Sequence, residues 1–364
     1  MTADQAASVS GINAPAASGD ARGLMPTESE QAAATAMLRL IWGIHSSRAV
    51  YAAAKLGIAD LLVDGPASCR ELARATGAHE PSLYRVLRLL AALGVFDEVE
   101  PGSFGLTVLG DRLRSDVPAG MRSWAVFLEA TGGVQPFEHI LETVRTGQPG
   151  MDIAFGTGIF EFLAQRPDSA VTFDAAMSER TAAFASTMAD TYDFSDIRSI
   201  VDVGGGQGTL LAGILRRHSH LHGTLFETAD VAARAEAVLA GADLAERCEV
   251  RPGNFFERVP GGADCYLLAN VLHDWDDQRA IDILGNCRQA MVRGGRVLIV
   301  ERLIPDGPGD AVPTLLSDIN MLVITGGRER TNAEYAALLA EAGLRIGAVH
   351  PVAFPYGVIE GLSG

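Results

Sequence analysis

Cysteine is scarce in this sequence, with 4 residues among 364, and no two of them form a CxxC pair. Cys69, Cys248, Cys265 and Cys287 lie far apart in the chain, which argues against a disulfide framework and against a zinc site built on cysteines. We expect them to be reduced thiols, most of them buried, as is usual in a cytosolic protein.

Long hydrophobic runs are also missing. No apolar stretch reaches the roughly 18 to 20 residues that a membrane-spanning helix needs. The first residues, MTADQAASVSGINAPAASGDARG, lack the basic start and the apolar centre of a secretory signal. The sequence therefore predicts a cytoplasmic protein that does not enter a membrane.

Basic residues are the minority charge. There are 29 Lys and Arg against 45 Asp and Glu, which gives a net charge of -16 and a pI of about 4.9. Such a surface repels nucleic-acid phosphates and anionic membranes, so we expect neither as a partner. Hydrophobic residues make up 48% of the chain, which is enough for two domains with cores of their own.

The chain begins with residues rich in Ala, Ser and Gly, and we expect a disordered tail over residues 1–27. The pattern over residues 28–62 is helical and apolar on most sides. A helix of this kind needs a partner surface, on another domain or another subunit.

The next segment, over residues 69–107, has the pattern of two helices followed by a hairpin. Leu83, Leu87 and Leu90 have helical spacing, and a Pro-Gly turn joins two short β-rich runs. This predicts a winged-helix arrangement, and we place a helical domain over residues 28–120.

Helical signals dominate residues 121–190, which we interpret as a bridge, and residues 191–364 alternate short β-rich runs with helices. Alternation of this kind predicts an α/β fold with a mostly parallel sheet covered by helices on both faces. The expected strands are Ser199–Val203, Gly223–Phe226, Cys248–Pro252, Cys265–Ala269 and Arg296–Val300.

A glycine-rich loop, DVGGGQG, follows the first of these strands over residues 202–208. The loop after a strand of an open α/β sheet lies where ligands bind, and glycine lets a ligand approach the backbone. Glu227 ends the next strand, where a carboxylate can accept hydrogen bonds from both hydroxyls of a ribose. The pattern favours a nucleoside-bearing cofactor over a simple tight turn. The GxGxxG of nicotinamide dehydrogenases is absent, since Thr209 stands at its last position.

Five further stretches follow in order: RPGNFF (251–256), LLANVLHDWDD (267–277), GGRVLIVERLIPD (294–306), LLSDINMLVITGGRERT (315–331) and YGVIEGL (356–362). Together they resemble the class I S-adenosylmethionine-dependent O-methyltransferases of the caffeate and hydroxyindole type, in particular the bacterial branch that acts on aromatic secondary metabolites. The resemblance implies a Rossmann-like catalytic domain, an N-terminal winged-helix dimerisation domain and a homodimer.

The resemblance also implies which residues contact the cofactor, S-adenosylmethionine, whose product is S-adenosylhomocysteine. The glycine loop should hold its methionine part, Glu227 its ribose, and the Gly253–Phe256 stretch its adenine. Asn254 stands where relatives have Asp, so it keeps an acceptor oxygen without the charge. The expected cofactor residues are Asp202, Gly204, Gly205, Gly206, Glu227, Asn254, Phe255 and Ala269.

His273 matches the catalytic histidine of this family. A phenol, with a pKa near 10, is a poor nucleophile at neutral pH, so a base that accepts its proton helps the reaction. Glu301 and Glu329 match two acids that orient the histidine. A histidine that only positions the substrate is the alternative interpretation.

For the substrate, the resemblance points to Met177, Asn320 and Met321 as walls of a pocket for an aromatic acceptor. No metal is implied. Two other functions stay open: an enzyme that binds S-adenosylmethionine but catalyses hydroxylation or decarboxylation, and a winged-helix DNA-binding regulator. The leucine-rich helix and the acidic chain count against the regulator.

Overall fold

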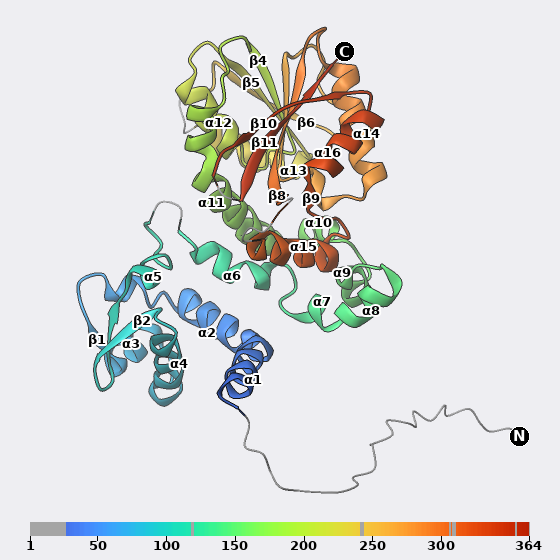
Figure 1. The fold of residues 1–364 in the computed structure, drawn as a ribbon. Helices are drawn as coiled ribbons and strands as arrows, with labels where there is room; N and C mark the ends of the chain where they lie inside the picture. Colours follow the sequence, from blue (N-terminus) through green and yellow to red (C-terminus); the bar gives the residue numbers. More distant parts are fainter. Residues whose placement is uncertain are drawn as a thin grey trace, which may run out of the picture. The chain divides into compact units, whose positions relative to one another are not determined.

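We describe the protein from a computed structural model that covers residues 27–117, 120–240, 244–305, 307, 311–353 and 355–363 (Figure 1). The expected tail lies outside the described residues except for Thr27. The chain forms two compact units, residues 1–46 and residues 47–364. The boundaries that we predict after residues 120 and 190 stay predictions.

Helix α1 (Glu28–Ile41) makes up most of the described part of the first unit. Its start is fixed by a capping box, in which the Thr27 hydroxyl accepts from the Glu30 N–H and the Glu30 carboxylate accepts from the Thr27 N–H. No residue of α1 is buried, and Leu40 and Trp42 are 76% and 61% exposed. Apolar side chains exposed at this density favour association with another protein surface.

The helical segment expected over residues 28–62 is confirmed, but as three pieces. Helix α2 (Gly43–Leu56) follows α1 directly, and a 3-10 helix η1 (Asp60–Leu62) comes next. Gly57 separates these two with a φ of 68°, a left-handed conformation that favours glycine.

The predicted winged-helix arrangement is confirmed in the second unit. Two helices precede a hairpin, and a short strand completes a three-stranded sheet in the order β1-β3-β2. Leu72, Leu83, Leu87 and Leu90 pack into one core with Phe96. The elements are β1 (Ala67–Ser68), α3 (Cys69–Thr76), α4 (Glu80–Ala92), β2 (Phe96–Glu100) and β3 (Ser103–Leu106).

The segment expected to be a helical bridge is helical throughout its described length, apart from loops. Its longest element is α11, which runs for 25 residues and packs along α6 and α12. Helix α5 (Val108–Asp111) precedes this segment. The elements of the segment are α6 (Arg122–Ala130), α7 (Gln135–Glu138), α8 (Ile140–Thr146), α9 (Gly150–Phe155), α10 (Ile159–Ala164) and α11 (Pro167–Thr191).

The large sheet has the path β10-β11-β8-β7-β4-β5-β6, with β9 paired to β8. Strands β4 to β8 pair in parallel, whereas β11 pairs antiparallel with both β8 and β10. The α/β prediction is therefore confirmed. The strands are β4 (Ser199–Val203), β5 (His222–Glu227), β6 (Cys248–Pro252), β7 (Cys265–Ala269), β8 (Arg296–Ile304), β9 (Arg330–Thr331), β10 (Arg345–Pro351) and β11 (Tyr356–Leu362).

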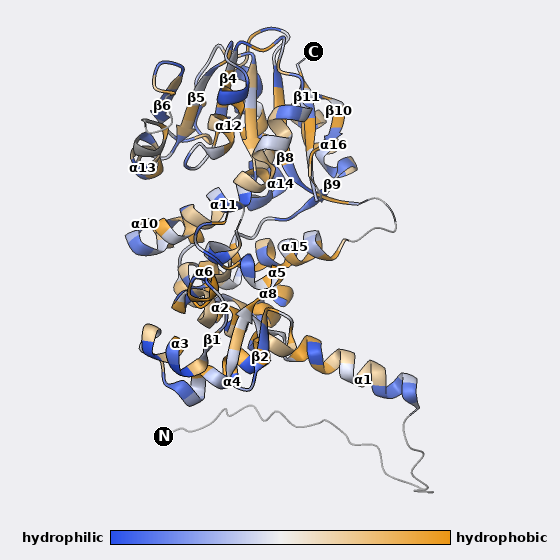
Figure 2. Cartoon of the chain, turned by 90° about the vertical axis from the view of Figure 1, so that its left-hand side faces the viewer, coloured by the Kyte–Doolittle hydropathy of each residue, from blue (hydrophilic) through white to orange (hydrophobic). Residues whose placement is uncertain are grey.

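Helices cover both faces of this sheet and make two separate cores. One core joins α11, α12 and α13 to one face, and the other joins α14 and α16 to the opposite face. Figure 2 shows the strands between them mostly in hydrophobic colours, as burial on both faces requires. The helices are α12 (Thr209–Arg217), α13 (Ala229–Ala240), α14 (Asp277–Ala290), α15 (Val312–Ile324) and α16 (Asn332–Glu341).

The order of the strands fixes where a ligand can bind. From β4 the chain proceeds to β5 and β6 on one side, and then returns to β7 and β8 on the other. The strand order thus reverses between β4 and β7, and the crevice at their carboxyl ends is the usual binding place in an open α/β sheet.

All four cysteines are free thiols, and Cys69, Cys265 and Cys287 are buried. This agrees with the expectation from the sequence. Among the described residues, no helix combines the length and the apolar character needed to cross a bilayer.

Candidate active site

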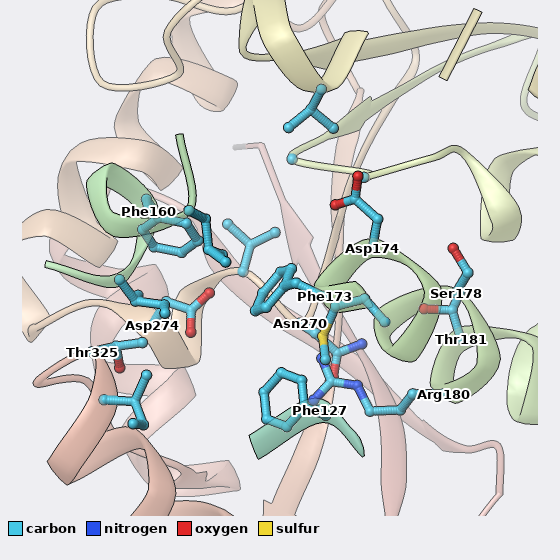
Figure 3. A pocket seen from close by; sticks show the side chains of 18 of the residues that line it. Phe127, Phe160, Phe173, Asp174, Ser178, Arg180, Thr181, Asn270, Asp274 and Thr325 are labelled. Atoms are coloured by element: carbon cyan, nitrogen blue, oxygen red, sulfur yellow. The ribbon is translucent and has the colours of Figure 1, made fainter. Parts of the chain in front are cut away.

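A cavity of about 1230 Å³ lies at the carboxyl ends of β4, β5 and β7, and helices α6, α10, α11 and α15 line its other sides (Figure 3). Pockets for one drug-sized ligand usually measure about 300 to 1,000 Å³. The larger volume here leaves room for two molecules side by side, such as a cofactor and an acceptor.

The glycine loop after β4 forms one wall of this cavity. Gly204 and Gly206 have φ angles of 70° and 58°, in the left-handed region. Gly205 lies against the Asp202 carboxylate and Leu225, so closely that a Cβ would collide with both. These conformations and this contact explain why the loop needs bare backbone.

Asp202 lies beneath the loop and does not line the cavity. Its carboxylate is fully buried and accepts no hydrogen bond from the described residues. Burial and the nearby Glu227 carboxylate raise the pKa of Asp202 to about 7. Asp202 is therefore behind the loop, apart from the cavity-lining residues, and its predicted contact with the cofactor stays a prediction.

Glu227, at the end of β5, lines the cavity and holds the loop at the same time. One carboxylate oxygen accepts from the Gly206 N–H at 3.0 Å, and the other accepts from the Thr228 N–H at 2.8 Å. Burial raises the pKa of Glu227, and these two hydrogen bonds act against that shift. The remaining lone pairs of the carboxylate are available to a ligand's hydroxyl groups.

The turn after β6 brings Asn254 and Phe255 to the same cavity, and Ala269 at the end of β7 lies there too. The Asn254 side-chain oxygen accepts from the Phe256 N–H at 3.0 Å, and its amide donates to Glu257 at 3.1 Å. Asn254 therefore stabilises its own turn. The cavity-lining residues predicted for the cofactor are thus brought together.

His273 lies in a short 3-10 helix, η2 (Leu272–Asp274), directly after β7, and only 2% of its side chain is exposed. Its Nδ1 is 2.9 Å from Glu301 Oε2 and 3.5 Å from Glu329 Oε1. The first contact is an ion pair when the ring is protonated. Since both carboxylates lie on the Nδ1 side, Nε2 is the nitrogen left for the cavity.

Glu301 also holds the backbone that carries the histidine. Its Oε1 accepts from the Val271 and Leu272 N–H groups at 3.0 Å, and from the His273 N–H at 3.4 Å. Glu301 is fully buried. It lies inside β8, which continues to Ile304 beyond the expected strand end, so the strand itself fixes the carboxylate behind the histidine.

Glu329 belongs to the segment between α15 and β9 and is held from both sides. The Ser317 hydroxyl donates to Glu329 Oε1 at 2.7 Å, and Asp318 accepts from the Glu329 N–H at 2.9 Å. Arg302 donates to the Ser317 oxygen at 2.8 Å. Neither Glu329 nor Glu301 lines the cavity, so both are positioning residues.

The neighbouring arginines have structural partners. Arg330 is fully buried and donates to Asp277 at 2.8 Å and to two backbone carbonyls of the histidine turn. Arg328 pairs with Glu334 at 2.5 Å. These two arginines thus belong to a structural network around the histidine turn.

The charges around His273 determine its protonation. Burial by itself lowers the pKa of His273, but Glu301, Asp274 and Glu329 outweigh it, and the pKa lies well above the usual 6.5. Asp274 Oδ1 lies 3.7 Å from His273 Nε2. Burial raises the pKa of Asp274 to about 6, although the charge of His273 acts to lower it. Burial acts to raise the pKa of Glu329, but the interactions with His273 and Ser317 outweigh burial and lower this pKa.

The raised pKa of His273 predicts how activity depends on pH. The predicted reaction can start from a neutral imidazole beside a phenol or from an imidazolium beside a phenolate, and both pairs contain the same number of protons. In either form, one proton must leave the resting enzyme before the reaction. We therefore expect kcat/KM to rise with pH through an apparent pKa above 6.5, which initial rates at constant ionic strength will measure. A profile that is flat above pH 6 would contradict this expectation.

The acceptor side of the cavity is mostly apolar. Met177 from α11 and both Asn320 and Met321 from α15 line it, as expected. Several cavity residues were not predicted as site residues, because aromatic side chains on amphipathic helices resemble ordinary core. These are Trp124, Phe127, Phe160, Phe173, Arg180, Asn270 and Trp275.

Asn270 has a feature that a sequence alone does not reveal. Its φ is 54°, the one positive value among the described residues other than glycine, and its side-chain oxygen is buried without a partner. Strained backbone of this kind occurs often at functional sites. It follows Ala269 and lines the cavity (Figure 3).

Comparisons with known proteins agree with this geometry. Residues 137–345 match the family model of the O-methyltransferase domain, and residues 38–116 match that of the O-methyltransferase dimerisation domain. The chain belongs to this O-methyltransferase family. The resemblance noted in the sequence is therefore confirmed, and the exposed α1 borders a dimerisation domain.

Characterised relatives cover most of this O-methyltransferase. The phenazine O-methyltransferase PhzM of Lysobacter antibioticus is 41% identical over 89% of this chain and 94% of its own. The aclacinomycin 10-hydroxylase RdmB of Streptomyces purpurascens is 37% identical over 85% of this chain and 84% of its own. A solved O-methyltransferase from neocarzinostatin biosynthesis, NcsB1, holds S-adenosylmethionine and 2-hydroxy-5-methyl naphthoic acid. It is 37% identical, with a TM-score of 0.77, over 87% of this chain and 96% of its own.

The protein is an S-adenosylmethionine-dependent O-methyltransferase. Its own residues fit that cofactor. The bare loop Gly204–Gly206, the Glu227 carboxylate and the Phe255 ring line one cavity, which offers a backbone free of side chains, a hydroxyl acceptor and an aromatic surface.

Proposed function

We propose that this O-methyltransferase methylates a hydroxyl group of an aromatic small molecule, with His273 as the general base. The observation that carries the proposal is the position of His273, which lines an aromatic cavity while two carboxylates lie behind its Nδ1. A nitrogen acceptor is the second candidate, and the same base would serve it.

The residues of the chain divide the chemical work. When bound, S-adenosylmethionine supplies an electrophilic methyl group. His273 Nε2 takes the proton of the acceptor hydroxyl, and Glu301 and Glu329 stabilise the resulting imidazolium. Phe127, Phe160 and Met177 enclose the acceptor and keep water out, so that its oxygen is aligned before it reacts.

Glu227 is expected to bind the ribose hydroxyls. We predict that Glu227→Ala weakens S-adenosylmethionine binding by about ten- to hundred-fold, because a charged hydrogen-bond acceptor and two loop anchors are lost. Calorimetry measures this directly. Glu236→Ala, at an exposed position of α13, is the matched control. Equal affinity of the Glu227 variant and the wild type would disprove the ribose assignment.

One experiment tests the function. The purified protein is incubated with S-adenosylmethionine and a panel of hydroxylated aromatic compounds in the presence of EDTA, and S-adenosylhomocysteine and the methylated product are both quantified. We expect the two in equal amounts. S-adenosylhomocysteine without a methylated product, or a hydroxylated or decarboxylated product without S-adenosylhomocysteine, would disprove methyl transfer to the acceptor. Loss of activity in EDTA would indicate a metal at His273, Glu301 and Glu329, whose ligand atoms lie within 4.8 Å of one another.

The assembly and location are proposals as well. The dimerisation domain and the exposed apolar side chains of α1 support a homodimer. Light scattering will give twice the mass of one chain if this is correct. The free thiols support a cytoplasmic location.

A further inference from the structure

Arg180 is a charged side chain without an acceptor in this cavity. It lies on α11, and Figure 3 shows it extending from that helix into the cavity. Its Nε is buried and lacks a hydrogen-bond partner, and Arg180 forms no ion pair with any described residue. Its guanidinium carbon lies 5.7 Å from the centre of the Trp124 ring.

The other arginines near the cavity have acceptors. Arg234 pairs with Asp174 at 2.7 Å, and Arg302 donates to Ser317 at 2.8 Å. A guanidinium group has five N–H donors and does not lose its charge in proteins. Holding such a group in a partly buried position costs free energy unless an anion or another acceptor completes it. Arg180 is thus prepared for an acceptor that the chain itself does not provide.

Arg180 is at the acceptor side of the cavity. The charge of Arg180 acts to lower the pKa of Asp274, next to His273, and the pKa of Arg302. At the ribose side, Glu227 is influenced instead by Asp174, which Arg234 already neutralises. The contact of the guanidinium with Trp124 of α6, and its place in the same cavity as His273, are the geometric basis for assigning it to the acceptor.

We propose that the acceptor of this enzyme is an aromatic hydroxy acid, whose carboxylate pairs with Arg180 while its hydroxyl faces His273. The proposal rests on the proposed function, because it assigns the acceptor of that same site. The planar guanidinium fork can donate two parallel hydrogen bonds to a carboxylate. A carboxylate anchored at one end of the ring system fixes which hydroxyl reaches Nε2, so Arg180 determines both acceptor choice and position of methylation.

The test compares acids with neutral analogues of the same shape. Hydroxylated benzoic, naphthoic and phenazine carboxylic acids are titrated into the enzyme loaded with S-adenosylhomocysteine, each beside its methyl ester. We expect at least one acid to bind about ten- to hundred-fold more tightly than its ester. Arg180→Gln should remove that preference, Arg180→Lys should retain part of it, and Arg293→Gln, at an exposed turn, should leave it unchanged.

Three outcomes overturn the inference. The first is that no acid binds more tightly than its ester. The second is that Arg180→Gln keeps the full preference. The third is that Arg180→Gln loses affinity for S-adenosylhomocysteine, which would assign the guanidinium to the cofactor's own carboxylate. Methyl transfer by the wild type to neutral acceptors, with no acid preferred, is the first of these outcomes and leaves the proposed function intact. Absence of methyl transfer to any acceptor would disprove the function itself.

Discussion

Replacing His273 with alanine is expected to lower kcat by about 10² to 10⁴-fold, the usual contribution of general acid–base catalysis. Affinity for S-adenosylmethionine should change little, because Glu227 and the glycine loop form a separate part of the wall. Rapid-quench measurements of product formation in a single turnover separate the chemical step from product release. Calorimetry with S-adenosylmethionine gives the affinity of the same variant.

His273→Gln is the matched control for this experiment. Glutamine fills much of the same space and still forms hydrogen bonds, but it cannot accept a proton at neutral pH. If both variants lose activity equally, proton transfer explains the loss. Recovery of activity in His273→Gln, or full activity in His273→Ala, would show that the histidine only positions the acceptor.

Much of the fold could be predicted from the sequence because its signals are local. Alternation of short β-rich runs with helices placed β4 to β7 to within one residue at each end, and the central strands β4 and β7 are buried on both faces. The breaks between α1 and α2 and between α2 and η1 were missed, because Gly43 and Gly57 lie within an otherwise continuous apolar pattern. A glycine in a helical pattern is ambiguous until its φ is known.

The site was predicted less completely, because it depends on which side chains the tertiary structure brings together. His273 could be found from its motif, but the two roles of Glu301 depend on a strand that continues past its expected end. Arg180 lies on a 25-residue helix with many polar positions. Nothing in its sequence context distinguishes it from a solvated arginine, whereas the structure places it without an acceptor beside Trp124.

The raised pKa of His273 keeps the ring protonated to a higher pH, which conflicts with its proposed role as a base. The carboxylates around His273 cause this conflict. Two carboxylates behind Nδ1 stabilise the imidazolium, which raises the pKa and also stabilises the state that proton transfer creates. A weaker set of acids would leave the imidazole neutral at lower pH but would stabilise the imidazolium less. With His273 as the proposed base, the enzyme regains in the proton-transfer step a part of what the raised pKa costs in neutral imidazole.

The second large effect is expected for Glu301→Gln, which changes one oxygen to an amide nitrogen without changing the shape. The backbone N–H groups of Val271 and Leu272 both point at Glu301 Oε1, so the glutamine must keep its oxygen there. Its NH₂ group then faces His273 Nδ1, which must act as an acceptor. The proton of the neutral ring moves to Nε2, and that nitrogen can no longer serve as the base.

We therefore predict that Glu301→Gln lowers kcat by about 10² to 10⁴-fold, as loss of the correct tautomer does in other enzymes with an oriented histidine. The ¹⁵N chemical shifts of the His273 ring should change from the Nδ1–H to the Nε2–H tautomer at high pH, which a merely structural role would not produce. Glu329→Gln is the matched control, with a smaller expected effect because its oxygen is 3.5 Å from Nδ1. Wild-type activity in Glu301→Gln would exclude a function for Glu301 in setting the tautomer. It would leave the backbone of the histidine turn as the feature that this carboxylate stabilises.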